Sequence, residues 1–163
     1  MKKIKIGNKE YTMEFTFAAA ECRECVQKMF WLISGAYMYK RLDESDDDKK
    51  RAEKYAMLDG SADMMAEIPH VCKSAFYAGL LENHEEITEE ESKSLMKQYM
   101  KEKKISFFKL YEELKKVMEE DGFFDLSGLT EMLNTMGQGA QENAEEKIKK
   151  IPQDHKKKST STN

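Results

Sequence analysis

Two cysteines of the chain have the spacing of a redox-active pair. Cys22 and Cys25 form a C-x-x-C sequence, the arrangement used by thiol–disulfide oxidoreductases. Such a pair needs its first cysteine at the N-terminus of a helix, where the helix dipole lowers the thiol pKa. The apolar periodicity around the pair instead predicts a helix with Cys22 more than one turn inside it, on the apolar face. We therefore expect both cysteines to be buried core residues.

The remaining cysteine and the histidines do not form a recognisable catalytic or metal site. Cys72 is a third thiol on the apolar face of another predicted helix, and a zinc site needs two ligands beyond the C-x-x-C pair. His70, His84 and His155 are scattered, without a partner at a useful spacing. The sequence contains no glycine-rich phosphate loop, nucleophile elbow or H-E-x-x-H motif. We expect no enzyme activity, no bound metal and no cofactor.

The composition favours a helical protein. Only eight glycines and two prolines interrupt 163 residues, and the abundant Lys, Glu, Met, Ala and Leu are good helix formers. A net charge of −4 argues against a nucleic-acid binder, which usually has a basic face. No apolar run reaches the roughly 18 residues of a membrane span. We expect no signal peptide after MKKIKIGNKE and, from the odd number of cysteines, a reducing cytoplasm.

The chain is organised around a helix predicted within residues 61–84. Its apolar face has the spacing of one side of a helix and is formed by Ile68, Cys72, Ala75, Phe76, Gly79 and Leu80. Pro69 lacks an amide hydrogen and crowds the preceding turn. We therefore expect a kink or break near Ile68, and a separate short helix over 49–58 that ends at Gly60.

A β-hairpin is predicted at the start of the chain. Residues 2–6 and 11–15 alternate between polar and apolar residues on either side of Gly7-Asn8-Lys9, which is the pattern of two strands joined by a tight turn. Because an isolated hairpin is marginally stable in water, this one must lie on helices. Thr16 then caps a long helix that extends to residue 37.

Capping signals predict the later helices. Thr88 to Glu91 has the form of a capping box, and Ser106 can cap the helix after it. Asp121-Gly122 ends that second helix. Residues 123–126 are then expected to be a short apolar linker before a last small helix that begins at Ser127.

These elements predict a mainly α fold. We expect a compact multi-helix bundle over residues 1–136, preceded by the small N-terminal β-hairpin. Residues 137–163 contain two aliphatic residues and no aromatic, so they cannot bury enough apolar surface to offset the entropy of ordering. They are predicted to be a disordered, flexible polar tail.

A second apolar stripe on the helix after Thr16 is a candidate surface for a partner. Trp31, Leu32 and Met38 fall largely off the main apolar face, and the aromatic Tyr39 lies beside them. Such a stripe indicates either burial on two sides or an exposed patch for another protein. We take Trp31, Leu32, Met38 and Tyr39 as the candidate partner-binding residues.

Taken in order, several segments resemble the tail assembly chaperones of long-tailed phages and prophages of Gram-positive bacteria. These segments are KIKIGNKEYTMEFTF, IPHVCKSAFYAGLLENH, ITEEESKSLMKQYM and DGFFDLSGLTEML. The resemblance covers residues 1–136, and its most telling pieces are Phe76 to Leu80 and Asp121 to Phe124. Trp31 and the acidic loop LDESDDD over 42–48 do not match the family.

The resemblance implies a small helical protein that binds the tape measure protein during tail assembly. Such a chaperone keeps that long helical protein soluble and helps to recruit the tail tube protein. It acts in the cytoplasm of the host bacterium, can form a homo-oligomer and is absent from the mature virion. In this family a programmed ribosomal frameshift commonly gives a longer product, and Lys156 to Lys158 is the natural place for a slippery run of adenines.

Two other functions remain open from the sequence. One is a thiol-redox protein that uses Cys22 and Cys25, and fast reaction of Cys22 in a thiol titration would favour it. The other is a small regulatory adaptor protein, which the neighbouring genes would distinguish.

Overall fold

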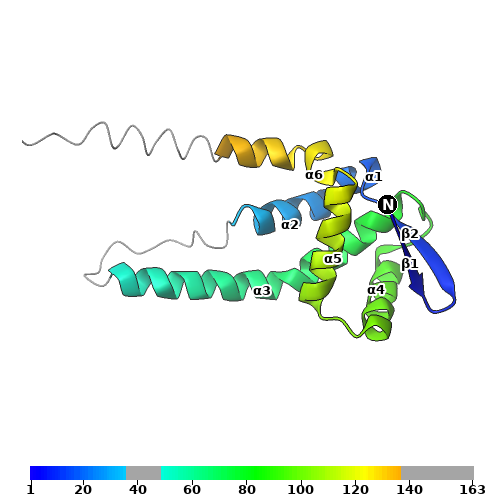
Figure 1. Cartoon of the computed structure of the whole chain (residues 1–163), viewed down its shortest axis with the longest axis horizontal. Helices are drawn as coiled ribbons and strands as arrows, with labels where there is room; N and C mark the ends of the chain where they lie inside the picture. The colour runs from blue at the N-terminus through cyan, green and yellow to red at the C-terminus, as the bar shows by residue number, and fades with distance from the viewer. Residues whose placement is uncertain (36–48, 137–163) are drawn as a thin grey trace, which may run out of the picture. The chain divides into compact units, whose positions relative to one another are not determined.

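A computed structural model describes residues 1–35 and 49–136, and for residues 49–56 it describes the backbone alone. This part of the chain is mainly helical and starts with a two-stranded hairpin (Figure 1), which confirms the predicted fold class. Residues 1–130 form one compact unit. Residues 131–136 belong to a second unit and are helical. The predicted tail, 137–163, lies outside the described residues.

The hairpin consists of β1 (Lys2–Ile6) and β2 (Lys9–Met13), which pair antiparallel with Ile6 opposite Lys9. Ile4, Ile6 and Met13 are buried on one face, as the alternation predicts. Gly7 takes a φ of 61° in the turn, and its N–H donates to the Glu102 carboxylate at 3.1 Å. The hairpin is therefore attached to the helices through both its apolar face and its turn.

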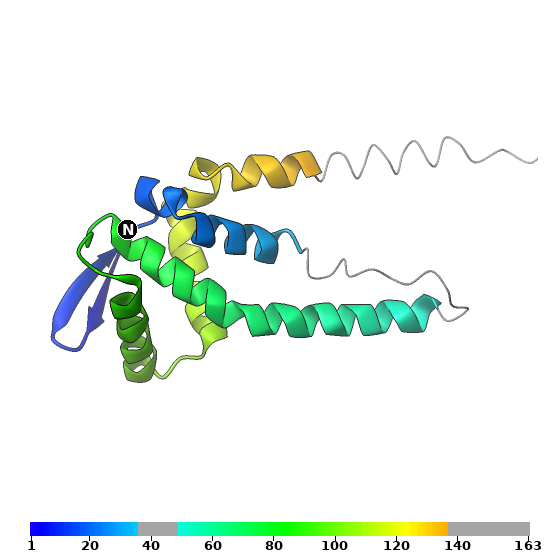
Figure 2. The ribbon, with the colours of Figure 1, turned by 180° about the vertical axis from the view of Figure 1, so that it is seen from behind.

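The central element is α3 (Lys49–Leu81), a single helix of 33 residues. The predicted helix end at Gly60 is wrong, and of the predicted kink or break near Ile68 the break is absent, because α3 continues through Gly60 and Pro69. Burial of the residues that follow Pro69 compensates for the backbone hydrogen bond that proline cannot make. Figure 2 shows that α3 changes direction partway along its length, as helices that contain proline commonly do.

The C-terminal half of α3 is the centre of the core. The predicted apolar face is buried throughout, and Phe76 is 1% exposed. Elements packed against α3 include α4 (Glu89–Lys103), α5 (Phe107–Glu120) and β2. Gly79 contacts the end of the hairpin: a Cβ at this position would lie 2.7 Å from Met13 Cγ and 2.8 Å from Phe15 Cζ. The hydrogen of glycine is thus what allows Met13 and Phe15 to reach the helix.

The predicted caps of α4 and α5 are present. The Thr88 hydroxyl accepts from the N–H of Glu91 at 3.3 Å, and the Glu91 carboxylate accepts from the N–H of Thr88 at 2.9 Å. Ser106 accepts from the N–H of Lys109 at 3.2 Å. Asp121 is the C-cap of α5. These local signals are reliable because each one satisfies backbone groups that a helix end leaves unpaired.

The segment after α5 differs from the prediction. Instead of an apolar linker, residues 123–126 form the one-turn helix α6 (Phe123–Leu126). Phe123 is buried, and its ring lies edge-on to that of Phe15 with 5.9 Å between centroids. Residues 129–136 are again helical, where the last small helix was predicted.

Candidate functional site

The first predicted helix is interrupted at Cys22. It consists of α1 (Phe17–Glu21) and α2 (Arg23–Ile33), with Cys22 between them at φ −70° and ψ 89°. Thr16 precedes α1 but its hydroxyl donates to the Glu82 carboxylate at 2.7 Å rather than capping the helix. The expectation that Cys22 lies inside a helix is therefore wrong. Cys22 is the N-cap of α2.

The two cysteines of the pair differ in exposure. Cys22 is half-buried and Cys25 is buried, and both are free thiols. Burial raises the pKa of the Cys25 thiol far above its usual value, and the nearby Cys22 and Glu24 add to this effect. At neutral pH Cys25 is therefore a protonated thiol, as expected of a core residue.

Cys72 is a core cysteine, as predicted. Its side chain is buried, and burial raises its pKa to about 12. The sulfur donates to the carbonyl of Phe107 at 3.3 Å. This contact places the start of α5 against the middle of α3.

His84 has a structural position beside the hairpin. Its Nε2 accepts from the N–H of Thr12 at 3.0 Å, and its ring lies edge-on to Tyr11 with 5.4 Å between centroids. Its Nδ1 is 3.9 Å from the Glu86 carboxylate. The imidazole thus satisfies a backbone donor on the outer edge of β2. His70 is exposed, and His155 lies outside the described residues.

An open groove of about 780 Å³ lies next to His84, between β2 and α4. Its lining includes Lys9, Glu10, Gln98 and several glutamates of the α3–α4 connection and α4. One of these, Glu91, already serves the capping box. The apolar side chains of Tyr11, Ile87 and Leu95 also line it, and because the groove is open it offers no enclosed position where a substrate could be held away from water.

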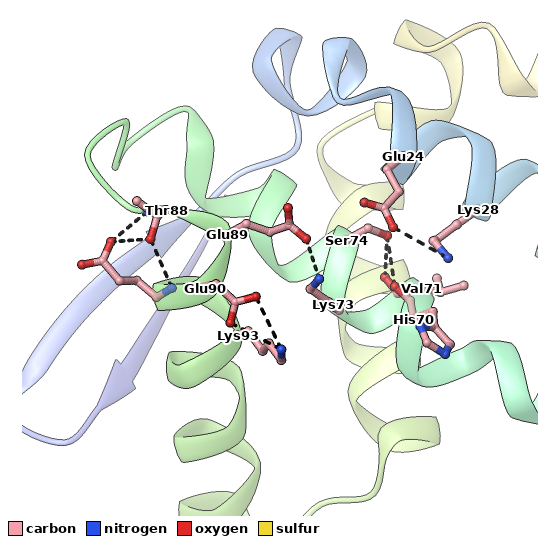
Figure 3. A network of polar contacts seen from close by, with 11 residues as sticks. Glu24, Lys28, His70, Val71, Lys73, Ser74, Thr88, Glu89, Glu90 and Lys93 are labelled. Carbon is pink, nitrogen blue, oxygen red and sulfur yellow. Dashed lines mark hydrogen bonds and ion pairs between the residues drawn. The ribbon is translucent and has the colours of Figure 1, made fainter.

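The polar contacts of α2, α3 and α4 have structural roles, and Figure 3 shows the contact between Lys73 and Glu89. Lys73 of α3 pairs with Glu89 of α4 at 2.6 Å, and Lys28 of α2 pairs with Glu67 of α3 at 2.9 Å. The hydroxyl of Ser74 donates to backbone carbonyls of its own helix. The two ion pairs join neighbouring helices, the Ser74 contacts lie within α3, and none of these contacts pairs two carboxyl groups as general acid–base catalysis would need.

The predicted partner-binding residues differ in their exposure to solvent. Trp31 is 47% exposed and lies edge-on to Phe30, with 6.5 Å between ring centroids. Leu32 is 8% exposed and belongs to the core, so it cannot contribute to an exposed surface in this conformation. Met38 and Tyr39 lie outside the described residues. A role of Trp31 in binding stays a prediction.

The N-terminal half of α3 exposes apolar side chains that the sequence analysis did not single out. Met57, Leu58 and Met65, here called the apolar stripe, are each more than half exposed. Seven-residue spacing places Leu58 and Met65 in line with Cys72, two turns further along the same face. Phe107 and Phe108, also exposed, begin α5 where it meets Cys72. The seven-residue spacing of Leu58, Met65 and Cys72 could have indicated this stripe from the sequence.

The described ranges 1–35 and 49–136 contain neither a metal-binding cluster nor a membrane-spanning helix. No group of three or more His, Cys, Asp or Glu side chains there could hold a metal ion. None of the helices in these ranges is long and apolar enough to cross a membrane.

The chain was compared with models of known protein families, with curated proteins and with solved structures, and none of the three comparisons gave a match.

Proposed function

We propose that this protein is a non-catalytic phage tail assembly chaperone that binds the tape measure protein and helps to recruit the tail tube protein. The observation that carries the proposal is the apolar stripe on α3. Its three large apolar side chains are each more than half exposed, and no described element covers them. Exposed apolar surface of this kind is typical of a protein-binding site.

The partner that fits such a surface is an amphipathic helix. A second helix laid along the N-terminal half of α3 would cover Met57, Leu58 and Met65 in the same way that the chain's own elements cover the residues after Ile68. Full burial of each of these side chains is worth about 1.5–3 kcal/mol, part of which is lost to the cost of association. Methionine adapts its shape to different neighbours, which suits a chaperone that contacts many segments of one long helical protein.

The remaining parts of the proposal follow the family resemblance. The protein acts in the host bacterial cytoplasm, binds neither nucleic acid nor a membrane, can form a homo-oligomer and is absent from the mature virion. A frameshifted longer product, with the shift at Lys156 to Lys158, belongs to the same proposal, and these lysines lie outside the described residues. The gene sequence tests the tape measure partner and the frameshift. A tape measure gene should lie immediately downstream, and an overlapping reading frame should begin at the lysine codons.

Co-expression with the tape measure protein tests the function directly. With the wild-type chaperone, the tape measure protein is expected in the supernatant after centrifugation. The double variant Leu58→Glu, Met65→Glu places two charges in the stripe and is expected to reduce that soluble fraction by about tenfold, because burying an unpaired charge is costly. Circular dichroism should show unchanged helix content and melting temperature.

Phe17→Glu is the matched control, since Phe17 is an exposed apolar residue of α1. It should leave the soluble fraction of the tape measure protein unchanged. If the double variant keeps as much tape measure protein soluble as the wild type does, the stripe is not the binding surface. If only Trp31→Ala lowers the soluble fraction, the binding surface lies on α2. Failure of the wild-type protein to solubilise the tape measure protein would overturn the proposed function.

A further inference from the structure

The break between α1 and α2 changes the position of the C-x-x-C pair in the helix. Cys22 is the N-cap of α2, so Cys25 is the third residue of the helix. The N–H of Cys22 donates to Ala19 at 3.2 Å and its carbonyl accepts from Val26 at 3.1 Å. The backbone of Cys22 therefore ends one helix and starts the next.

The same protein shows how close side chains come at these two helix positions. In α4 the N-cap and third residues are Thr88 and Glu91, whose side-chain oxygens are 2.8 Å apart. Cys22 and Cys25 are the equivalent residues of α2. A first cysteine at the N-terminus of a helix is the arrangement that redox-active C-x-x-C pairs use.

The exposure of the two thiols gives them different roles. Cys22 is half-buried and packs at the edge of the core, whereas Cys25 is fully enclosed, so Cys22 is the more accessible of the two residues. The geometry thus assigns the first attack to Cys22 and the second to Cys25.

We propose that Cys22 and Cys25 are a dithiol–disulfide pair that exchanges with low-molecular-weight disulfides. The Cys22 thiolate attacks one sulfur of the reagent, forms a mixed disulfide and releases one thiolate, which takes up a proton. The Cys25 sulfur then attacks the Cys22 sulfur, and its proton passes to the second leaving thiolate. Two electrons and two protons move from the protein to the reagent, which leaves as two thiols. The pair lies outside the apolar stripe and does not depend on the proposed chaperone function.

Glutathione redox buffers test this pair in the purified full-length protein. After alkylation of remaining thiols, peptide mapping by mass spectrometry should find the Cys22–Cys25 disulfide in the wild type, with a yield that rises as the ratio of oxidised to reduced glutathione rises. In Cys25→Ser the second step is absent, so a glutathione adduct at Cys22 should accumulate to about ten times its wild-type level.

Cys72→Ser is the matched control, because it removes a buried thiol that has no part in the exchange. It should form the Cys22–Cys25 disulfide as the wild type does. Two results would overturn the proposal: a wild type that contains no such disulfide in fully oxidised glutathione, or equal glutathione adducts in the wild type and Cys25→Ser. The wild-type measurement decides the question even if a variant fails to fold.

Discussion

The two halves of α3 belong to one helix, yet their apolar side chains have opposite surroundings. Leu58, Met65, Cys72 and Gly79 follow one another at seven-residue intervals, and the first two are exposed while the last two are buried. The hairpin and the later helices pack against the second half. An apolar face therefore predicts which side of a helix avoids water, but the neighbouring elements decide whether this chain or another molecule covers it.

The largest expected change in stability comes from a comparison of one residue from each half of α3. Phe76→Ala leaves a cavity in the core and should reduce the free energy of unfolding by roughly 3–5 kcal/mol. Met65→Ala removes a side chain that is 54% exposed and should change it by no more than about 0.5 kcal/mol. Chemical denaturation of both variants measures the two values. A loss below about 1 kcal/mol for Phe76→Ala would contradict the assignment of the C-terminal half as the core.

A smaller effect is expected where the hairpin meets the helix. Gly79→Ala adds a methyl group less than 3 Å from Met13 and Phe15, and overpacking of this kind costs about 1–3 kcal/mol. In a Met13→Ala background the added cost should be smaller, because one of the two clashing side chains is gone. A double-mutant cycle measured by denaturant unfolding gives this coupling. Equal costs in both backgrounds would show that Met13 does not limit the approach.

The smallest effect concerns the start of α4, which packs against the second half of α3. Hydrogen bonds from the backbone and hydroxyl of Thr88 lower the pKa of Glu91 below its usual value. The Glu91 carboxylate therefore stabilises the folded state. Because its folded-state pKa is depressed, this stabilisation is complete above the unfolded-state pKa of about 4.5 and is lost as the pH falls through the folded-state pKa. The melting temperature of Glu91→Gln should be slightly below that of the wild type at pH 7, and the gap should shrink progressively below pH 4.5. A gap that is constant with pH would exclude the charge as its cause.

The sequence predicted those features that have local causes. The hairpin alternation, the caps at Thr88 and Ser106 and the buried face around Phe76 each depend on residues a few positions apart. The same reasoning misjudged α3, since Gly60 and Pro69 locally favour helix ends while burial of the neighbouring residues favours continuation.

The candidate sites were harder to predict, because they depend on what packs nearby. No glycine or proline marks the break at Cys22, so periodicity alone gave one continuous helix and the wrong position for the C-x-x-C pair. Leu32 was a candidate partner-binding residue on a stripe that could be either buried or exposed, and it is buried. The apolar stripe was overlooked, since only the fold reveals that the chain leaves it uncovered.

The hydrogen bonds of the first fifteen residues have a consequence for synthesis of the protein. The N–H of Glu14 donates to Gly79 at 2.8 Å, and the N–H of Phe15 donates to the Asp121 carboxylate at 3.0 Å. The start of the chain therefore completes its contacts only after residue 121 has left the ribosome, and until then its apolar strand faces remain accessible to other nascent chains. Contacts between residues so distant in sequence also slow folding, so the hairpin is expected to be among the last parts of the molecule to reach its final position.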